Sequence, residues 1–170
     1  MSLNIYFQYP GTMQLDKSCL HKVIEEQLKI LLMNTSQAAI QAYETATHEE
    51  NKAENKYDTL GLEAAYLAEG QSKRVMQLEE NLATFNKLRV KQFSPDMEIG
   101  VGALVCLTTA KNEQKHFFIS PVAGGISLHY QNMFIMLITP SSPLGVALIN
   151  SSIGDDVHLN DTSYNITHIC

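Results

Sequence analysis

The sequence predicts an α+β protein, in which an N-terminal antiparallel α-helical coiled-coil hairpin precedes a small α+β domain. Two long segments, residues 15–47 and 54–90, contain no proline and place apolar or small residues at alternating spacings of three and four. This spacing is typical of a packed helix. After Ser94 and Pro95 the pattern changes to short, apolar, β-rich segments. A chain of 170 residues, 45% hydrophobic and 18% charged, is long and apolar enough to fold in this way.

Each helical segment carries one narrow apolar stripe, so neither helix is expected to be stable alone. The stripe of the first helix consists of Leu20, Ile24, Gln27 or Leu28, Leu31, Thr35, Ala38, Ala42 and Thr45. The stripe of the second consists of Tyr57, Leu60, Ala64, Leu67, Gln71, Val75, Leu78, Leu82, Phe85 and Leu88. The two helices are predicted to fold back on one another near residues 50–53, forming an arm on the order of 45 to 50 Å long. Gly61 and Gly70 lie inside the second helix and indicate close approach of its partner.

The second half of the chain reads as a compact, mainly antiparallel sheet. Segments 100–108, 116–120 and 132–139 are predicted strands, residues 123–125 a turn, and segments 155–159 and 163–169 closing strands. Ser142 is a helix cap with Pro143 at the first position, which predicts a short helix over 144–149. The aromatic residues expected in the core are Phe117, Phe118, Tyr130 and Phe134.

The predicted domains are the hairpin, residues 13–92, and the C-terminal domain, residues 96–170. Residues 1–12 differ in composition, and residues 4–8 resemble a processing-protease recognition sequence, so we interpret them as a tag or a disordered leader.

Composition excludes several classes of function. The formal net charge of −6 argues against a general nucleic-acid coat protein. Three widely spaced cysteines suggest neither a disulfide framework nor a zinc site, which favours a reducing, cytoplasmic location. No apolar run approaches the roughly 20 residues that span a bilayer, so no membrane partner is expected. His48 and Glu49 begin like a zinc-protease motif, but Lys52 stands where its second histidine belongs.

The reversal between the helices is strongly acidic. Glu49, Glu50, Glu54 and Asp58 lie within ten residues, together with two lysines. One interpretation is a solvated helix reversal, whose carboxylates favour the start of the second helix through its dipole. The other is a tip that supplies oxygen ligands to Mg²⁺ in another macromolecule, because carboxylates are the ligands that this ion prefers.

Two motifs resemble a known family. Glu54-Asn55, followed fifteen positions later by Glu69-Gly70 in a continuing helix, is similar to the second coiled-coil helix of the GreA/GreB transcript cleavage factors of bacterial RNA polymerase. Residues 142–148, SPLGVAL, and 154–157, GDDV, resemble that family's C-terminal signatures. Together the motifs cover most of residues 15–169.

The resemblance implies an FKBP-like C-terminal domain that docks on RNA polymerase and a coiled coil that enters the secondary channel. It assigns docking to Ser142, Pro143, Leu144, Gly145, Gly154 and Asp155. It implies no activity of the chain's own and no cofactor of its own: the tip would help the polymerase hold a shared Mg²⁺ that cuts backtracked nascent RNA.

At the tip, the resemblance places Glu54 on the family's catalytic glutamate and Asn51 on its aspartate, three residues earlier. Asparagine is a neutral and weaker ligand, so the missing charge would come from Glu50, and the metal ligands expected here are Glu54 and Glu50. A regulator that occupies the channel without stimulating cleavage is therefore the alternative that Asn51 favours. A prolyl isomerase or chaperone built on the FKBP-like domain ranks third. It needs an aromatic-lined pocket, and the aromatic residues of this domain are expected to form its core instead.

Overall fold

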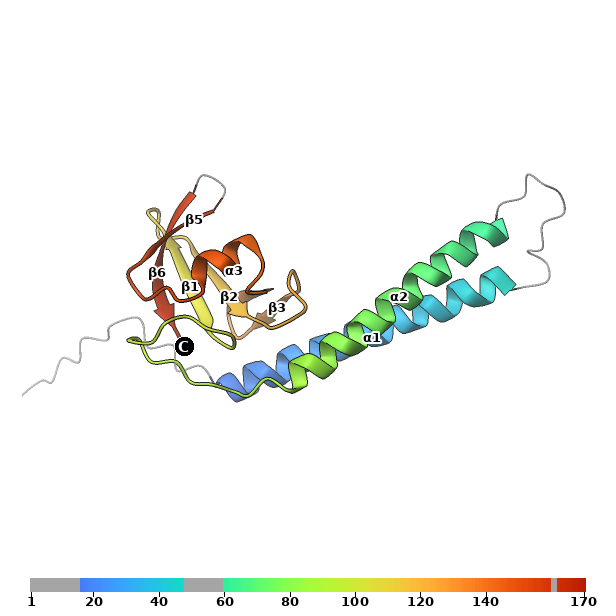
Figure 1. Ribbon diagram of the computed structural model, residues 1–170, viewed down its shortest axis with the longest axis horizontal. Helices are drawn as coiled ribbons and strands as arrows, with labels where there is room; N and C mark the ends of the chain where they lie inside the picture. Colours follow the sequence, from blue (N-terminus) through green and yellow to red (C-terminus); the bar gives the residue numbers. More distant parts are fainter. Residues whose placement is uncertain (1–15, 48–59, 160–161) are drawn as a thin grey trace, which may run out of the picture.

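The computed structural model describes residues 16–47, 60–159 and 162–170. Two long helices, α1 (Lys17–Thr47) and α2 (Leu60–Asn86), run antiparallel as an arm that projects from a six-stranded sheet (Figure 1). This confirms the predicted α+β class with its helical hairpin. The first turn of α1 is closed by Asp16, whose carboxylate accepts hydrogen bonds from the N–H groups of Ser18 and Cys19 at 2.9 and 3.1 Å.

The seam of the arm follows the predicted spacing over most of its length, but Thr45 and Leu67 are exposed and Leu88 lies beyond the end of α2. Its buried members are Leu20, Ile24, Leu28 and Ala42 of α1 with Ala64, Ala68, Leu78 and Phe85 of α2. The prediction was wrong for Leu67, which is 55% exposed, while the smaller Ala68 takes the buried position. The step of four from Ala64 continues the helical face to residue 68, so the helical period overrides the greater apolarity of the neighbouring leucine.

Gly70 does not mark close helix packing. A methyl group added at its Cα would meet no atom within 4 Å, and the residue is exposed. The prediction of a close approach to the partner helix is therefore wrong at this position. The glycine lowers the intrinsic stability of the helix without a packing benefit in the described structure.

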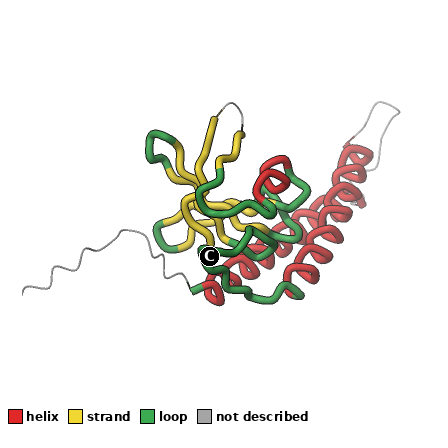
Figure 2. The backbone as a smooth tube through the Cα atoms, turned by 60° about the vertical axis from the view of Figure 1, so that its left-hand side comes forward, coloured by secondary structure: helices red, strands yellow, loops and turns green. Residues whose placement is uncertain are grey.

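The sheet contains β1 (Leu104–Thr109), β2 (Gln114–Ile119), β3 (Ser127–Tyr130), β4 (Met133–Ile138), β5 (Asp156–Leu159) and β6 (Thr162–Ile169). The strand order is β3-β4-β2-β1-β6-β5, and all pairs are antiparallel except β2 with β4. Figure 2 shows the strands gathered at one end of the arm. The sequence did not predict β3. This four-residue strand turns back onto β4 at Gln131 and Asn132, and it lets β4 lie parallel to β2.

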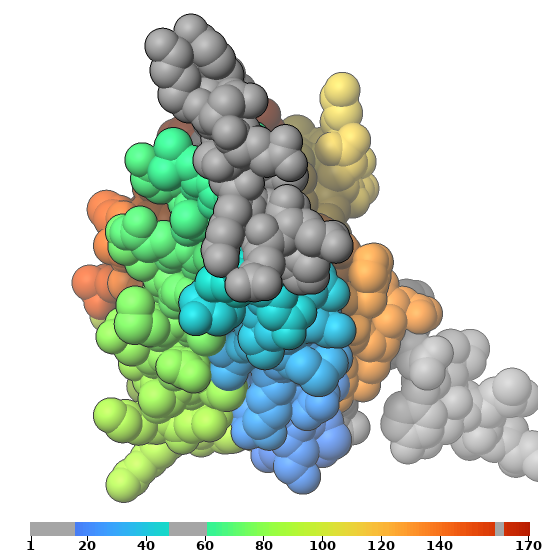
Figure 3. Space-filling view, turned by 90° about the vertical axis from the view of Figure 1, so that its right-hand side faces the viewer, coloured from blue at the N-terminus to red at the C-terminus, as the bar shows by residue number. Residues whose placement is uncertain are grey.

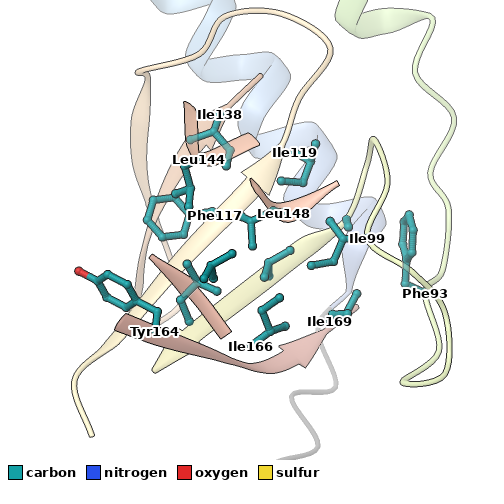
Figure 4. Close-up of a cluster of buried hydrophobic side chains, with 14 residues drawn as sticks. Phe93, Ile99, Phe117, Ile119, Ile138, Leu144, Leu148, Tyr164, Ile166 and Ile169 are labelled. Carbon is teal, nitrogen blue, oxygen red and sulfur yellow. The ribbon is translucent and has the colours of Figure 1, made fainter. Parts of the chain in front are cut away.

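The sheet is covered on both faces, which explains why Phe117 and Phe118 are buried although they are consecutive. One face packs under α3 (Pro143–Leu148), together with Phe93 and Ile99 from the segment that follows the arm (Figure 4). The other face packs against the base of the arm, where its buried members are Leu20, Ile24, Leu28, Phe85, Leu104, Phe118, Leu128, Ile135 and Leu137.

Phe134 corrects the predicted core. Its side chain is 52% exposed, although it was expected to be buried with the other aromatic residues. Tyr130 is only partly buried, at the margin of the core beneath the arm. Among the described helices, none is long and apolar enough to cross a membrane.

Candidate functional site

The acidic segment that the sequence singles out joins the two helices at the distal end of the arm. α1 ends at Thr47 and α2 begins at Leu60, and these two ends lie side by side far from the sheet (Figure 1). Glu50, Asn51 and Glu54 lie outside the described residues. Their assignment as catalytic residues, and of Glu54 and Glu50 as metal ligands, therefore stays a prediction. Within the described ranges, no group of three or more His, Cys, Asp or Glu side chains could hold a metal ion.

The arm carries apolar side chains on its outer surface between residues 30 and 43 of α1 and between residues 62 and 76 of α2. Large hydrophobic residues with exposed fractions between 40 and 66% are Ile30, Met33, Ile40 and Tyr43 of α1 and Leu62, Tyr66, Leu67 and Met76 of α2. Figure 3 views the molecule from the distal end of the arm, where α1 and α2 lie side by side. Exposed hydrophobic residues that gather into a contiguous patch can mark an interaction site, whereas single ones are common on protein surfaces.

The exposed residues of α2 form a regular stripe. Leu62, Tyr66 and Met76 lie on the face away from α1, since their positions differ by four and ten residues at about 100° per residue. Glu69 and Lys73 lie on the same face and form an ion pair of 2.7 Å. The hydrogen bond from Lys73 lowers the pKa of the Glu69 carboxyl.

The charged groups of the distal arm are few and mostly satisfied locally. Between Lys29 and Thr47, Glu44 is the only acidic or basic residue in the sequence. Arg74 donates a hydrogen bond to the side chain of Gln77 at 2.8 Å. Such a surface has little to offer a phosphate backbone, which binds through clustered cations. It fits enclosure by protein better than binding along nucleic acid.

The first C-terminal signature has a folding role. The Ser142 hydroxyl caps α3: it accepts a hydrogen bond from the N–H of Gly145 at 3.1 Å and donates to the carbonyl of Thr139 at 2.7 Å. Pro143 occupies the first turn, as predicted, and Leu144 is buried. A Cβ atom added to Gly145 would come within 1.9 Å of the Thr139 carbonyl oxygen, so this position requires glycine.

The second signature also has a local role. Gly154 has a φ angle of +94°, in the region that favours glycine, and its N–H donates to the carbonyl of Ile166 at 2.8 Å. The Asp155 carboxylate accepts a hydrogen bond from the N–H of Ser152 at 2.8 Å. The fold therefore explains much of both signatures. Of the six residues assigned to docking, only Pro143, Gly154 and Asp155 are exposed, and no described contact tests their docking role.

A pocket of about 450 Å³ lies at the beginnings of β2 and β4, and the sequence did not predict it. Its apolar wall contains Phe117, Met133, Phe134 and Met136, and Lys115 lies at its edge. His116 also lines it, and burial, followed by the proximity of His168, lowers the pKa of His116. The apolar run over residues 132–139 predicted a strand with Phe134 in the core. The sequence did not indicate that the beginning of this strand would be exposed beside the short helix α3.

Similarity to known proteins is found among solved structures. No protein-family model matches the chain, and no curated protein matches its sequence. The structure is similar to the crystal structure of the GreA factor homolog 1 (Gfh1) protein of Thermus thermophilus, with 18% identity, 86% of this chain and 94% of that chain covered, and a TM-score of 0.36. A second structure, that of the transcription factor Gfh1, has 17% identity and a TM-score of 0.35, with 85% of this chain and 92% of that chain covered.

Thermus aquaticus Gfh1 gives 18% identity, coverage of 85% of this chain and 92% of that chain, and a TM-score of 0.34. Because these TM-scores are below 0.5, we base the functional proposal on the residues of this chain.

Proposed function

We propose that this chain is a Gre-like transcription elongation factor that binds bacterial RNA polymerase and inserts its arm into the secondary channel. The observation that supports this most is the exposed apolar surface on the arm, from Ile30 to Tyr43 and from Leu62 to Met76. Leaving such side chains in water is unfavourable, so a partner that encloses the arm would stabilise it by removing them from water.

The geometry of the arm suits delivery of a chemical group. Two helices packed along a continuous seam are stiffer than one, and both distal helix ends flank the acidic segment. In the proposed mechanism, Glu54 and Glu50 lend carboxylate oxygens to a Mg²⁺ ion in the polymerase active centre, which positions the water that cuts backtracked RNA. The chain itself is an accessory factor, and the hydrolytic activity belongs to the polymerase.

A second candidate is a regulator that occupies the same channel without stimulating cleavage. Asn51 favours it, because a neutral amide stands where the resemblance places a carboxylate. Both candidates need the same apolar arm and the same partner. They differ only in the chemistry of the tip.

The test is the rate of RNA shortening in stalled, backtracked polymerase complexes at limiting Mg²⁺. Wild type is compared with Glu50→Gln, Glu54→Gln and Asn51→Asp, with binding measured in parallel. If the tip completes a metal site, Glu54→Gln should remove most of the stimulation without weakening binding, since the amide keeps the shape and loses the charge. Asn51→Asp should raise the rate.

The other outcomes separate the candidates. An inactive wild type with an active Asn51→Asp variant identifies a channel-binding regulator that lacks one ligand. If all four proteins bind and none shortens RNA, the acidic segment is a solvated helix reversal and the cleavage mechanism is wrong.

A further inference from the structure

The pocket beside Phe134 lies on the α3 face of the sheet, at the end that α3 leaves uncovered. Three side chains of β4 point to this face, and their burial increases along the strand: Phe134 is 52% exposed, Met136 is partly buried and Ile138 is 7% exposed. α3 contains six residues and covers only the later part of the strand. The beginning of β4 therefore presents the aromatic ring of Phe134 to solvent, beside the partly buried thioether of Met136.

Phe134 is held in place although it is exposed. The imidazole of His129, its partner across β3 and β4, packs edge-on against the ring with 5.1 Å between centroids. Phe117 and Met136, which belong to the cluster on this face of the sheet, also line the pocket. Exposed Phe and Met side chains around a preformed hollow are typical of the centre of a protein interface, where the partner contributes an apolar anchor.

The charge at the edge of the pocket indicates the chemistry of the partner. From Phe93 onward the sequence contains six acidic residues and only two basic ones, Lys111 and Lys115, and both belong to the β1–β2 hairpin. Lys115 lines the pocket and donates a hydrogen bond to the Tyr164 hydroxyl at 2.8 Å. No carboxylate within the described residues forms an ion pair with it. A cation fixed at this place in an acidic domain complements a carboxylate of the partner.

We infer that the Phe134 pocket is the surface by which the sheet domain docks on RNA polymerase, and that it receives an apolar side chain of a polymerase segment flanked by a carboxylate. The apolar side chain fills the hollow between Phe117 and Phe134, and the carboxylate pairs with Lys115. This rests on the proposed function for the identity of the partner. Docking is assigned to the Phe134 pocket and not to the two signatures, because the fold itself explains much of the signatures and no role in folding explains the exposed pocket.

The test measures the affinity of the full chain for purified polymerase core enzyme by fluorescence anisotropy. Phe134→Ser removes the exposed ring without placing a new charge beside Lys115, and we expect it to raise the Kd at least tenfold. Val146→Ser is the matched control, because Val146 is an apolar residue of the same domain, 66% exposed, and does not line the pocket. It should change the Kd less than twofold.

Charge reversal provides a second, independent variant. Lys115→Glu should raise the Kd at least threefold, and the effect should weaken at high salt, whereas Lys111→Glu should change it less. Circular dichroism of each variant checks that the fold is retained.

The outcomes distinguish the docking surface from the function. If wild type binds polymerase and Phe134→Ser binds equally well, the docking surface is wrong and the proposed function stands. If wild type does not bind polymerase, both are wrong. If sedimentation shows a dimer of wild type that Phe134→Ser dissociates, the occupant is a second copy of the chain, and the inference is overturned.

Discussion

The ammonium group of Lys17, at the start of α1, lies 2.8 Å from the main-chain oxygen of Cys170, which is 153 positions later in the chain. The same group donates to the carbonyl oxygens of Lys91 and Gly102 at 2.6 and 2.7 Å, and it lies 4.6 Å from the centroid of the Phe93 ring. Only 1% of the residue is exposed. One side chain thus connects the base of the arm to the segment after α2, to the loop before β1 and to the end of β6.

Replacing Lys17 should destabilise the connection between arm and sheet. Lys17→Met keeps most of the volume but removes the donor to the carbonyl oxygens of Lys91 and Gly102, whereas the Cys170 oxygen still accepts from the N–H of Leu104 at 2.8 Å. Each buried unsatisfied group costs about 1–3 kcal/mol. Removal of the buried charge offsets part of this, so we expect a net loss of about 2 kcal/mol. Urea denaturation measures it, with Lys22→Met as the exposed control on the same helix. Equal stability of the two variants would contradict the role of Lys17.

Lys17 should also give stability a particular pH dependence. Burial lowers its pKa from 10.5 to about 8, so between these values the unfolded chain binds more protons than the folded one. The proton-linked part of the Lys17 contribution to the free energy of unfolding is therefore complete above pH 10.5 and is lost as the pH falls through 8, whereas the part due to its hydrogen bonds remains. Wild type should gain stability relative to Lys17→Met as the pH rises through this window.

Both proteins in this experiment should also carry Cys170→Ser. Burial raises the pKa of the Cys170 thiol and the charge of Lys17 lowers it, so the thiol would add a pH dependence of its own. A difference between the two proteins that does not change with pH would contradict the lowered pKa of Lys17.

The seam of the arm predicts opposite outcomes for two leucines of α2. Leu78 is 1% exposed, whereas Leu67 is 55% exposed. Leu78→Asp places an unpaired charge between the helices and removes apolar burial, so it should cost at least about 4 kcal/mol and unfold much of the arm. Leu67→Asp should change the melting temperature little. Circular dichroism at 222 nm measures both, and equal effects would show that the register of the arm is wrong.

Two glycines should respond in opposite directions to alanine. Gly70→Ala should stabilise the arm by about 0.5–1 kcal/mol, because the added methyl group meets open space and alanine is the better helix former. Gly145→Ala should strongly destabilise the sheet domain, since the added Cβ would collide with the Thr139 carbonyl. Thermal denaturation checks both. A loss of stability in Gly70→Ala would mean that this face of α2 is packed.

The sequence predicts those features of the structure that depend on residues a few positions apart, and misses those that depend on contacts between distant parts of the chain. The helices of the arm and the Ser142 cap follow from spacing and from residue preference within a few positions, and the structure confirms them. The burial of Lys17 could not be predicted, because its three acceptors come from distant parts of the chain.

The same reason explains what the sequence missed in the sheet. The exposure of Phe134 depends on the length of α3 and on the parallel pairing of β2 with β4, both of which are tertiary features. For the candidate site, the acidic segment is evident from composition. The apolar outer surface of the arm becomes visible only when the seam is fixed and shows which hydrophobic residues it leaves out.

The central claim is that RNA polymerase encloses the distal half of the arm. The most direct measurement replaces Tyr66, which is 66% exposed on the outer face of α2, with the photoreactive residue benzoylphenylalanine and irradiates the full chain bound to polymerase core enzyme. We expect a covalent product with a polymerase subunit, lost when an excess of unmodified chain is added before irradiation. The same substitution at Ile40, on the outer face of α1, should give a product as well. Binding that is retained while neither position forms a product would contradict the claim.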